Sequence, residues 1–467
     1  MSTKITFIAD THHFSPTLTD EGRAFQLRSG SDQKCLIETG AIIDASFDYI
    51  ANSDTQAVML AGDVSDDGER VSHEELREKL YKLQQKKPVY LITATHDWCC
   101  DENPRGYFGE EETHDIPTIP HEELREFYFD FGPKQALSEY ITHLGVVSYT
   151  VDLSDEVRLL AINDDQSGVG HAGYSDEHFA WIKEQIAKAK EDGKVMLGME
   201  HHLILPHVHP IISGFGMRVG YPRDAATLLA DAGLKYMFVG HSHIHRVTQL
   251  TTEKGNTITQ VNVGSLVGYP SSIVNVTVDG EKVTIDTVCA PTFEFKGTKN
   301  TEQYLEEHLY GLVDNIIYPG ASKDTKEFQA RLRALGIRGK ANETIGKFHW
   351  AIRPIIKYIT KAKVKNAYRL VKLVTFGTSK ISKKDAKEYW DVPVMDFIHD
   401  CLRNVIGGTP VPHEADSAYC RLLKEVVSVP KFYVRKNKFC RELPDLAESL
   451  VTGGKFNNHH DTISDVR

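Results

Sequence analysis

The segment Ile5-Thr6-Phe7-Ile8-Ala9-Asp10-Thr11-His12 is a short apolar run that ends directly in an aspartate and a histidine. Apolar and β-branched residues in such a run predict a buried β-strand, with the polar pair at its tip. The arrangement returns further along the chain: Ala57–Ala61 precedes Gly62-Asp63, and Tyr236–Val239 precedes Gly240-His241. Loops at strand ends are where α/β proteins present their ligands, so this recurring pattern decides both the expected fold and the expected site.

Helix-like segments separate the apolar runs as far as about Pro291. Ser72-His73-Glu74-Glu75 has the spacing of a capping box and is expected to open a helix over Leu76–Gln85, and Ser175 is expected to cap another helix. Strands that alternate with helices predict an α/β architecture with helices covering the sheets. Further strands are expected at residues 89–93, 157–162, 195–199, 257–263, 273–278 and 282–288, the last two joined by a hairpin at Asp279-Gly280.

The last third of the chain has a different pattern, in which apolar residues recur at helical spacing, as in Ile352, Ile355, Ile356 and Ile359. We therefore expect a catalytic domain over residues 1–291, an all-α domain over residues 292–456 and a polar tail over residues 457–467.

Composition excludes several classes of protein. With 467 residues, 41% hydrophobic and 25% charged, the chain is neither a disordered acidic chain, a collagen-like fibre nor a small disulfide scaffold. The formal charge of −11 disfavours nucleic acid as a partner of the whole molecule. The seven cysteines form no CxxC pair, so neither a zinc ribbon nor a disulfide framework is indicated. Neither a signal peptide nor a long apolar stretch is present, so we expect a cytoplasmic protein.

Five short clusters rich in histidine and acidic residues stand where strands are expected to end. They are Asp10-Thr-His12, Gly62-Asp63-Val-Ser-Asp66, Thr95-His96-Asp97, Glu200-His201-His202 and Gly240-His241-Ser-His243. Aspartate and imidazole are costly to bury without partners, and a pair of divalent cations would explain why both recur at strand tips. Carboxylate and imidazole together suit Mn, Fe or Zn.

This ordered set of motifs resembles the calcineurin-like metallophosphoesterase superfamily, over about residues 4–290. The segments between the motifs are also similar to the bacterial cyclic nucleotide phosphodiesterase branch, at residues 66–76, 103–105, 201–207 and 263–270. The resemblance implies a sandwich of two mixed β-sheets flanked by helices, followed by the all-α domain.

The resemblance also implies a role for each motif residue. A first metal would be held by Asp10, His12, Asp63 and His243, and a second by Asp63, His201 and His241. Thr95 takes the position where the family has a metal-ligating asparagine, so we expect a weakened or water-completed second site. His96 is the expected general acid with Asp97 orienting its imidazole, and His202 and His207 are candidate substrate contacts.

These implications lead to one functional hypothesis and its alternatives. The favoured hypothesis is hydrolysis of a small phosphodiester, of the cyclic nucleotide class, by a hydroxide activated at a dinuclear metal centre, with His96 protonating the leaving group. The alternatives are a nucleotide-sugar pyrophosphatase or phosphomonoesterase of the same superfamily, and a regulatory binding module that retains the fold.

A basic segment lies in the helical region. Residues 346–384 contain eleven lysines and arginines, no acidic residue, and several interleaved aromatic side chains. Such a segment is a candidate for contact with an anionic lipid or nucleic acid. The favoured interpretation is a solvated helical face or a face docked on the acidic catalytic domain, and the oligomeric state stays open.

Overall fold

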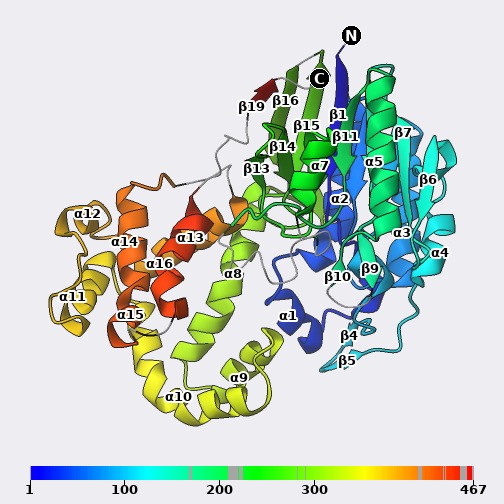
Figure 1. Ribbon diagram of the computed structural model, residues 1–467. Helices are drawn as coiled ribbons and strands as arrows, with labels where there is room; N and C mark the ends of the chain where they lie inside the picture. The colour runs from blue at the N-terminus through cyan, green and yellow to red at the C-terminus, as the bar shows by residue number, and fades with distance from the viewer. Residues whose placement is uncertain are drawn as a thin grey trace. The chain divides into compact units, whose positions relative to one another are not determined.

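The protein was analysed as a computed structural model, which describes residues 2–167, 171–208, 219, 224–280, 282–289, 291–408, 413–434, 436, 438–452 and 460–464. The chain forms two compact units (Figure 1). The first comprises residues 1–22, 34–305 and 454–467, and the second comprises residues 23–33 and 306–453. The first unit thus runs past the expected boundary at residue 291 as far as Leu305.

Two mixed β-sheets form the first unit. In the six-stranded sheet, β1, β2 and β3 are parallel and the other neighbouring pairs of strands are antiparallel. In the seven-stranded sheet, β8, β11, β12 and β14 are parallel. The first has the order β19 (His460–Ser464), β16 (Lys282–Cys289), β15 (Ser272–Asp279), β1 (Thr3–Ile8), β2 (Ala57–Ala61), β3 (Val89–Ile92). The second has the order β13 (Arg246–Thr251), β14 (Thr257–Asn262), β12 (Tyr236–Val239), β11 (Val195–Met199), β8 (Val157–Ala161), β7 (Val147–Asp152), β6 (Ser138–Ile141).

The main core lies between the two sheets. Phe7 of β1 and Phe238 of β12 meet there edge to face, with ring centroids 5.2 Å apart, among fully buried aliphatic side chains from both sheets. A second apolar cluster joins the outer face of the seven-stranded sheet to helices α5 (Asp176–Glu191) and α7 (Ala225–Ala232) (Figure 1). Helix α3 (Arg70–Gln84) packs against β3, and α2 (Thr39–Asn52) packs against α3. The expected two-sheet sandwich flanked by helices is confirmed.

Smaller elements complete this unit. Three two-stranded hairpins are formed by β4 (Gly106–Phe108) with β5 (Glu111–Thr113), β9 (Asp165–Ser167) with β10 (His171–Ala172), and β17 (Phe293–Phe295) with β18 (Thr298–Asn300). The short helices are η1 (Pro16–Leu18), η2 (Leu36–Glu38), η3 (Thr95–Trp98), α4 (His121–Phe127) and η4 (Pro133–Gln135). Residues 457–459 and 465–467 of the expected polar tail lie outside the described residues.

The two expected helix starts have different outcomes. Ser175 caps α5 as predicted, and its Oγ accepts a hydrogen bond from the backbone N–H of His178 at 3.1 Å. The expected cap at Ser72 is wrong, because α3 begins at Arg70 and places Ser72 in its first turn. The Ser72 Oγ instead accepts a hydrogen bond from the backbone N–H of Ser15 at 3.1 Å. The hydroxyl therefore holds the loop after β1 on the helix.

The second unit is helical. It contains α1 (Arg23–Ser29), α9 (Thr325–Ala334), α10 (Gly339–Ile359), α11 (Val364–Val374), α12 (Lys383–Glu388), α13 (Val394–Gly407), α14 (Ala418–Val427), α15 (Val429–Tyr433), α16 (Lys438–Val451) and most of α8 (Glu302–Ala321). The basic segment covers most of α10, all of α11 and the start of α12, where Trp350, Leu373 and Phe376 are 74%, 72% and 82% exposed. Among the described residues, every helix is too short or too polar to span a bilayer.

Candidate metal centre

The candidate site is built on the carboxyl ends of parallel strands. Asp10 follows β1 and Asp63 follows β2, while His201 and His241 follow β11 and β12 of the other sheet. The backbone is left-handed at Asp10 (φ 53°), Asp63 (φ 47°) and His241 (φ 69°). Such φ values are unfavourable for residues other than glycine and concentrate at functional sites. The fold therefore holds these tips in conformations that their residue types do not favour.

A glycine beside one of these tips is required by close approach. An added Cβ at Gly240 would lie 2.5 Å from Oδ2 of Asp10 and 2.7 Å from Cβ of Ala9. The backbone N–H of His241, the next residue, donates to both carboxylate oxygens of Asp10 at 3.1 and 2.9 Å. Because Gly240 has no side chain, the loop after β12 can approach the loop after β1 closely enough to form these hydrogen bonds.

Asp10, His12 and His243 form the first cluster of donor atoms. The Nε2 atoms of His12 and His243 face each other at 3.1 Å, and Nε2 of His243 lies 3.5 Å from Oδ1 of Asp10. Burial, and next the ammonium group of Lys34, lower the pKa of His12 well below its usual value. The His12 ring is therefore neutral and keeps a lone pair for a metal ion.

Asp63, His201 and His241 form the second cluster. Nε2 of His201 lies 3.0 Å from Oδ2 of Asp63 and 3.2 Å from Nδ1 of His241. The Nδ1–H of His201 donates to the backbone oxygen of Ala61 at 2.8 Å, which directs Nε2 into the cluster, where a metal ion would take the place of its proton. Burial acts to lower the pKa of His201, but Asp63 outweighs it and raises the pKa well above its usual value. Asp63 Oδ2 is also 3.9 Å from Nε2 of His12, so this carboxylate lies between the two clusters.

The chemistry of these donors fits divalent cations. Ligand atoms that share a tetrahedral ion at 2.0–2.1 Å are separated by about 3.3 Å. Four pairs of ligand atoms in the two clusters lie 3.0–3.5 Å apart, and Nε2 of His12 and Oδ1 of Asp10 lie 3.8 Å apart. Buried carboxylates and imidazoles without cysteine are a donor set suited to Mn, Fe or Zn. The two clusters could therefore hold two metal ions, with Asp63 between them.

His96 stands at the exposed side of these clusters. Its side chain is 42% exposed, whereas Asp10, His12 and His201 are buried. The Nδ1–H of His96 donates to the backbone oxygen of Asp66, and Nδ1 also lies 3.6 Å from Oδ1 of Asp67. Burial acts to lower the pKa of His96, but the carboxylates of Asp63 and Asp67 outweigh it and raise the pKa to about 9. The ring is therefore protonated at neutral pH and can donate a proton.

The expectation that Asp97 orients the His96 imidazole is wrong. Oδ1 of Asp97 accepts hydrogen bonds from the backbone N–H groups of Val64 and Ser65 at 2.8 and 2.9 Å, and Oδ2 accepts from Ala94 N–H at 2.8 Å. The fully buried carboxylate thus ties the loop after β2 to the loop after β3. The groups that bond or face Nδ1 of His96 come from Asp66 and Asp67 instead.

The remaining expected site residues lie in three different surroundings. Thr95 opens η3, and its backbone oxygen accepts a hydrogen bond from the backbone N–H of Cys100 at 3.1 Å. His202 lies beside His241, with ring centroids 4.3 Å apart. His207 is buried, and both of its ring nitrogens lack a hydrogen-bond partner within the described part of the chain. Burial, and next Arg246, lower its pKa to about 3, so this ring is neutral.

Two further groups of residues were not identified from the sequence. Asp164 and Asp165 lie shortly after β8 and are buried, and a ligand atom of each lies within 4.8 Å of one of His202. The signal was present, because an apolar strand again ends in acidic residues. Lys34, whose buried ammonium pairs with Asp66, has no comparable signal, because nothing near it in the sequence distinguishes it from a surface lysine.

Residues 3–245, more than half of the chain, match the family profile of the calcineurin-like phosphoesterases. No curated protein sequence matches the chain. Solved structures with some likeness include a dimetal phosphatase from Danio rerio, at 10% identity and a TM-score of 0.42, covering 62% of this chain and 99% of that one. Another is the purple acid phosphatase PPD1 from yellow lupin (Lupinus luteus), at 11% identity and a TM-score of 0.40, covering 64% of this chain and 53% of that one. TM-scores this low carry no argument about substrate, so the assignment rests on the family profile.

Proposed function

The chain belongs to the calcineurin-like phosphoesterase family and is a hydrolase of phosphoesters, and we propose that its substrate is a small phosphodiester of the cyclic nucleotide class. The observation that carries this proposal is the position of His96. Its backbone N–H donates to Oδ1 of Asp63 at 3.1 Å, and its ring centroid lies 4.9 Å from that of His12, so the imidazole stands beside the proposed metal ligands. An acid held there can reach the leaving group of a phosphoryl ester bound at the metal ions.

Two groups of residues would take part in the reaction, the metal ligands and the proton donor His96. The proposed ligands are Asp10, His12, Asp63, His201, His241 and His243, and divalent ions bound there would supply positive charge for the phosphoryl oxygens and for the attacking water. A cation on Asp63 would offset part of the effect of that carboxylate and so lower the pKa of His96. A pKa nearer neutrality suits a general acid at neutral pH.

A proton donor matters most for an alkoxide leaving group. The sugar oxygen released from a cyclic nucleotide is strongly basic and departs badly without a proton, whereas a nitrophenolate does not need one. The backbone oxygen of Asp66 fixes Nδ1 of His96, so Nε2 is the nitrogen left to deliver the proton. His96 therefore fits an alkyl phosphodiester better than an activated aryl ester.

Three of the segments that resemble the cyclic nucleotide branch lie around this site. Asp66 accepts the His96 hydrogen bond, and Nε of Arg105 lies 3.6 Å from Oδ2 of Asp67, beside the same ring. The Ser265 hydroxyl donates to the backbone oxygen of Asp10 at 2.8 Å. These segments support the proposed substrate class, since residues that surround the metal ligands are placed to contact the rest of the substrate.

A substrate panel with an acid-site variant tests the proposal. The wild type is assayed with Mn on cyclic AMP, cyclic GMP, dinucleotides, nucleotide sugars, a phosphomonoester and bis-nitrophenyl phosphate, and the same panel is run on His96→Ala and on the control His143→Ala. His143 is exposed in the turn after β6. We expect the His96 variant to lose about 10²–10⁴-fold on cyclic nucleotides and far less on the nitrophenyl ester.

Each other outcome changes one part of the proposal. Equal losses on both substrates would remove the acid role of His96. Preference for nucleotide sugars or monoesters would replace the substrate class with the pyrophosphatase or phosphomonoesterase alternative. Hydrolysis that survives complete removal of metal by a chelator would overturn the proposed centre, and binding of nucleotides without turnover would identify a regulatory module.

A further inference from the structure

The second cluster lacks one ligand that the family pattern provides. The first metal ion would have Asp10, His12, Asp63 and His243, whereas the second would have only Asp63, His201 and His241. Thr95 stands at the family's asparagine position and offers a hydroxyl, which is shorter and a weaker neutral ligand than an amide oxygen. A fourth protein ligand must therefore come from another residue, or the position is left to water.

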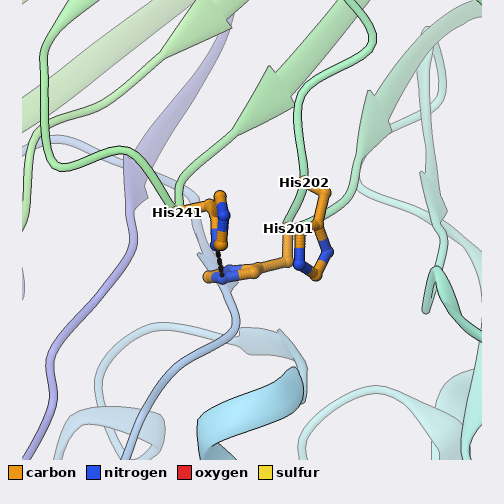
Figure 2. Close-up of side chains that lie close together, drawn as sticks. All are labelled: His201, His202 and His241. Atoms are coloured by element: carbon orange, nitrogen blue, oxygen red, sulfur yellow. Dashed lines mark hydrogen bonds between the residues drawn. The ribbon is translucent and has the colours of Figure 1, made fainter. Parts of the chain in front are cut away.

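His202 is placed to supply that ligand. One ligand atom from each of His201, His202 and His241 lies within 4.8 Å of the others. The His202 ring centroid is 4.3 Å from that of His241 and 5.0 Å from that of His201. Figure 2 shows the three imidazoles gathered at the ends of neighbouring strands. Three buried or half-buried imidazoles so close together repel one another if protonated, but they can share a cation.

Asp164 fixes which nitrogen of His202 is free to bind. Oδ1 of Asp164 lies 3.1 Å from Nδ1 of His202 and accepts its hydrogen, and Oδ2 accepts the backbone N–H of the same residue at 2.9 Å. In a neutral ring with hydrogen on Nδ1, the lone pair is on Nε2. A carboxylate that bonds the second nitrogen of a histidine is the usual support of a metal-ligating imidazole. Asp164 is 1% exposed, so water does not compete for this pair.

We propose that Nε2 of His202, positioned by Asp164, is a ligand of the second metal ion and replaces the asparagine that this chain lacks at Thr95. The inference rests on the proposed function, since it assumes that the second cluster binds a metal ion. It makes the second site complete, with three imidazoles and one carboxylate, where the sequence indicated a weakened one. Imidazole ligands favour Zn or Fe(II) over Mn and Mg, so this site prefers the former pair.

Metal binding to the whole chain tests this inference without relying on activity. Equilibrium dialysis with Zn(II), and the visible spectrum of the Co(II)-loaded protein, are measured for the wild type, His202→Ala, His202→Phe, Asp164→Asn and the control His143→Ala. We expect two ions for the wild type and the control. The His202 variants should keep one tight ion and bind the second at least 10-fold more weakly, with the corresponding loss of Co(II) absorption. Asp164→Asn should weaken the second ion about 10–100-fold.

A rescue variant separates a ligand from a packing residue. Thr95→Asn restores the family's ligand, so it should recover tight second-site binding in the His202→Ala background. His202→Phe keeps a ring beside His241, and retention of the second ion in that variant would overturn the inference. So would tight binding of two ions to His202→Ala, or failure of the rescue while the first ion stays bound. A wild type that binds no ion would instead overturn the proposed function itself.

Discussion

Replacing Asp97 with alanine should destabilise the first unit, called the catalytic unit because it carries the candidate metal centre. The effect should not be limited to proton transfer. The Asp97 carboxylate accepts hydrogen bonds from the buried backbone N–H groups of Val64, Ser65 and Ala94, at 2.8, 2.9 and 2.8 Å. Alanine leaves all three donors without a partner in a place that excludes water. Each buried unsatisfied group costs about 1–3 kcal/mol, so the free energy of unfolding should fall by at least about 3 kcal/mol.

Asparagine at the same position gives a smaller and distinguishable loss. Its side-chain oxygen can still accept from the N–H groups of Val64 and Ser65. Its side-chain NH₂ group then faces the backbone N–H of Ala94, so two hydrogen-bond donors face each other and Ala94 N–H loses its acceptor. One lost hydrogen bond predicts a destabilisation of about 1–3 kcal/mol. The order of stability should therefore be wild type, Asp97→Asn and then Asp97→Ala.

The assay is urea unfolding followed by tryptophan fluorescence. A chain with two units need not unfold in one step, so the signal must report on one unit only. Of the four tryptophans, Trp350 and Trp390 lie in the helical unit. With both replaced by phenylalanine, the remaining Trp98 and Trp181 report only on the catalytic unit.

The matched control is the exposed Asp155→Ala, which should stay within about 0.5 kcal/mol of the parent. If Asp97→Ala is as stable as this control and yet loses activity on alkyl phosphodiesters, the reasoning is refuted. Asp97 would then act on His96 after all.

Three further predictions concern other parts of the catalytic unit. Gly240→Ala places a Cβ 2.5 Å from Oδ2 of Asp10 and should weaken binding of the first metal ion at least 10-fold in equilibrium dialysis, while Gly311→Ala, with its nearest neighbour at 3.8 Å, should bind metal normally. Burial lowers the pKa of His73 from 6.5 to about 4. Between pH 6.5 and pH 4 the histidine is therefore protonated in the unfolded chain but neutral in the folded chain. Stability is therefore full above pH 6.5 and falls by up to about 3 kcal/mol as the pH drops to 4, a slope that His73→Gln should reduce in urea titrations at several pH values. Ser175→Ala removes the cap of α5 and should cost about 1 kcal/mol in the same urea assay, and an unchanged midpoint would contradict the cap.

Much of the fold could be predicted from the sequence because the central strands are buried on both faces. β2 and β11 have the predicted bounds, since every residue in them is apolar or glycine and buried. β6 and β7 were not predicted. β6 is an edge of the seven-stranded sheet and is only partly buried, so its sequence Ser138–Ile141 has no continuous apolar run, while β7 beside it alternates apolar and polar residues and has no such run either. The pattern therefore reveals the interior of each sheet better than its edge.

The error at Asp97 has a geometric cause. Neighbours in sequence suggest a pair, but Thr95–Trp98 forms a 3₁₀ turn, in which successive side chains point about 120° apart. His96 consequently points outward and Asp97 points inward, toward the loop after β2. The backbone conformation after β3 sets the directions of these two side chains, and no single residue in the motif predicts that conformation.

From the sequence, His202 is only a candidate substrate contact, and strand geometry does not suggest the metal contact proposed above. Within a strand, consecutive side chains alternate between the faces, so two adjacent histidines would not be expected to meet at one centre. β11 ends at Met199, however, and beyond that residue the alternation no longer applies. The backbone N–H and Nδ1 of His202 are both held by Asp164, beyond the tip of the neighbouring strand β8, and the His201 and His202 ring centroids lie 5.0 Å apart. In the proposed second site, Asp164 would therefore let both adjacent histidines serve one metal ion. Its own place next to β11 follows from strand pairing, which the order of motifs along the chain does not reveal.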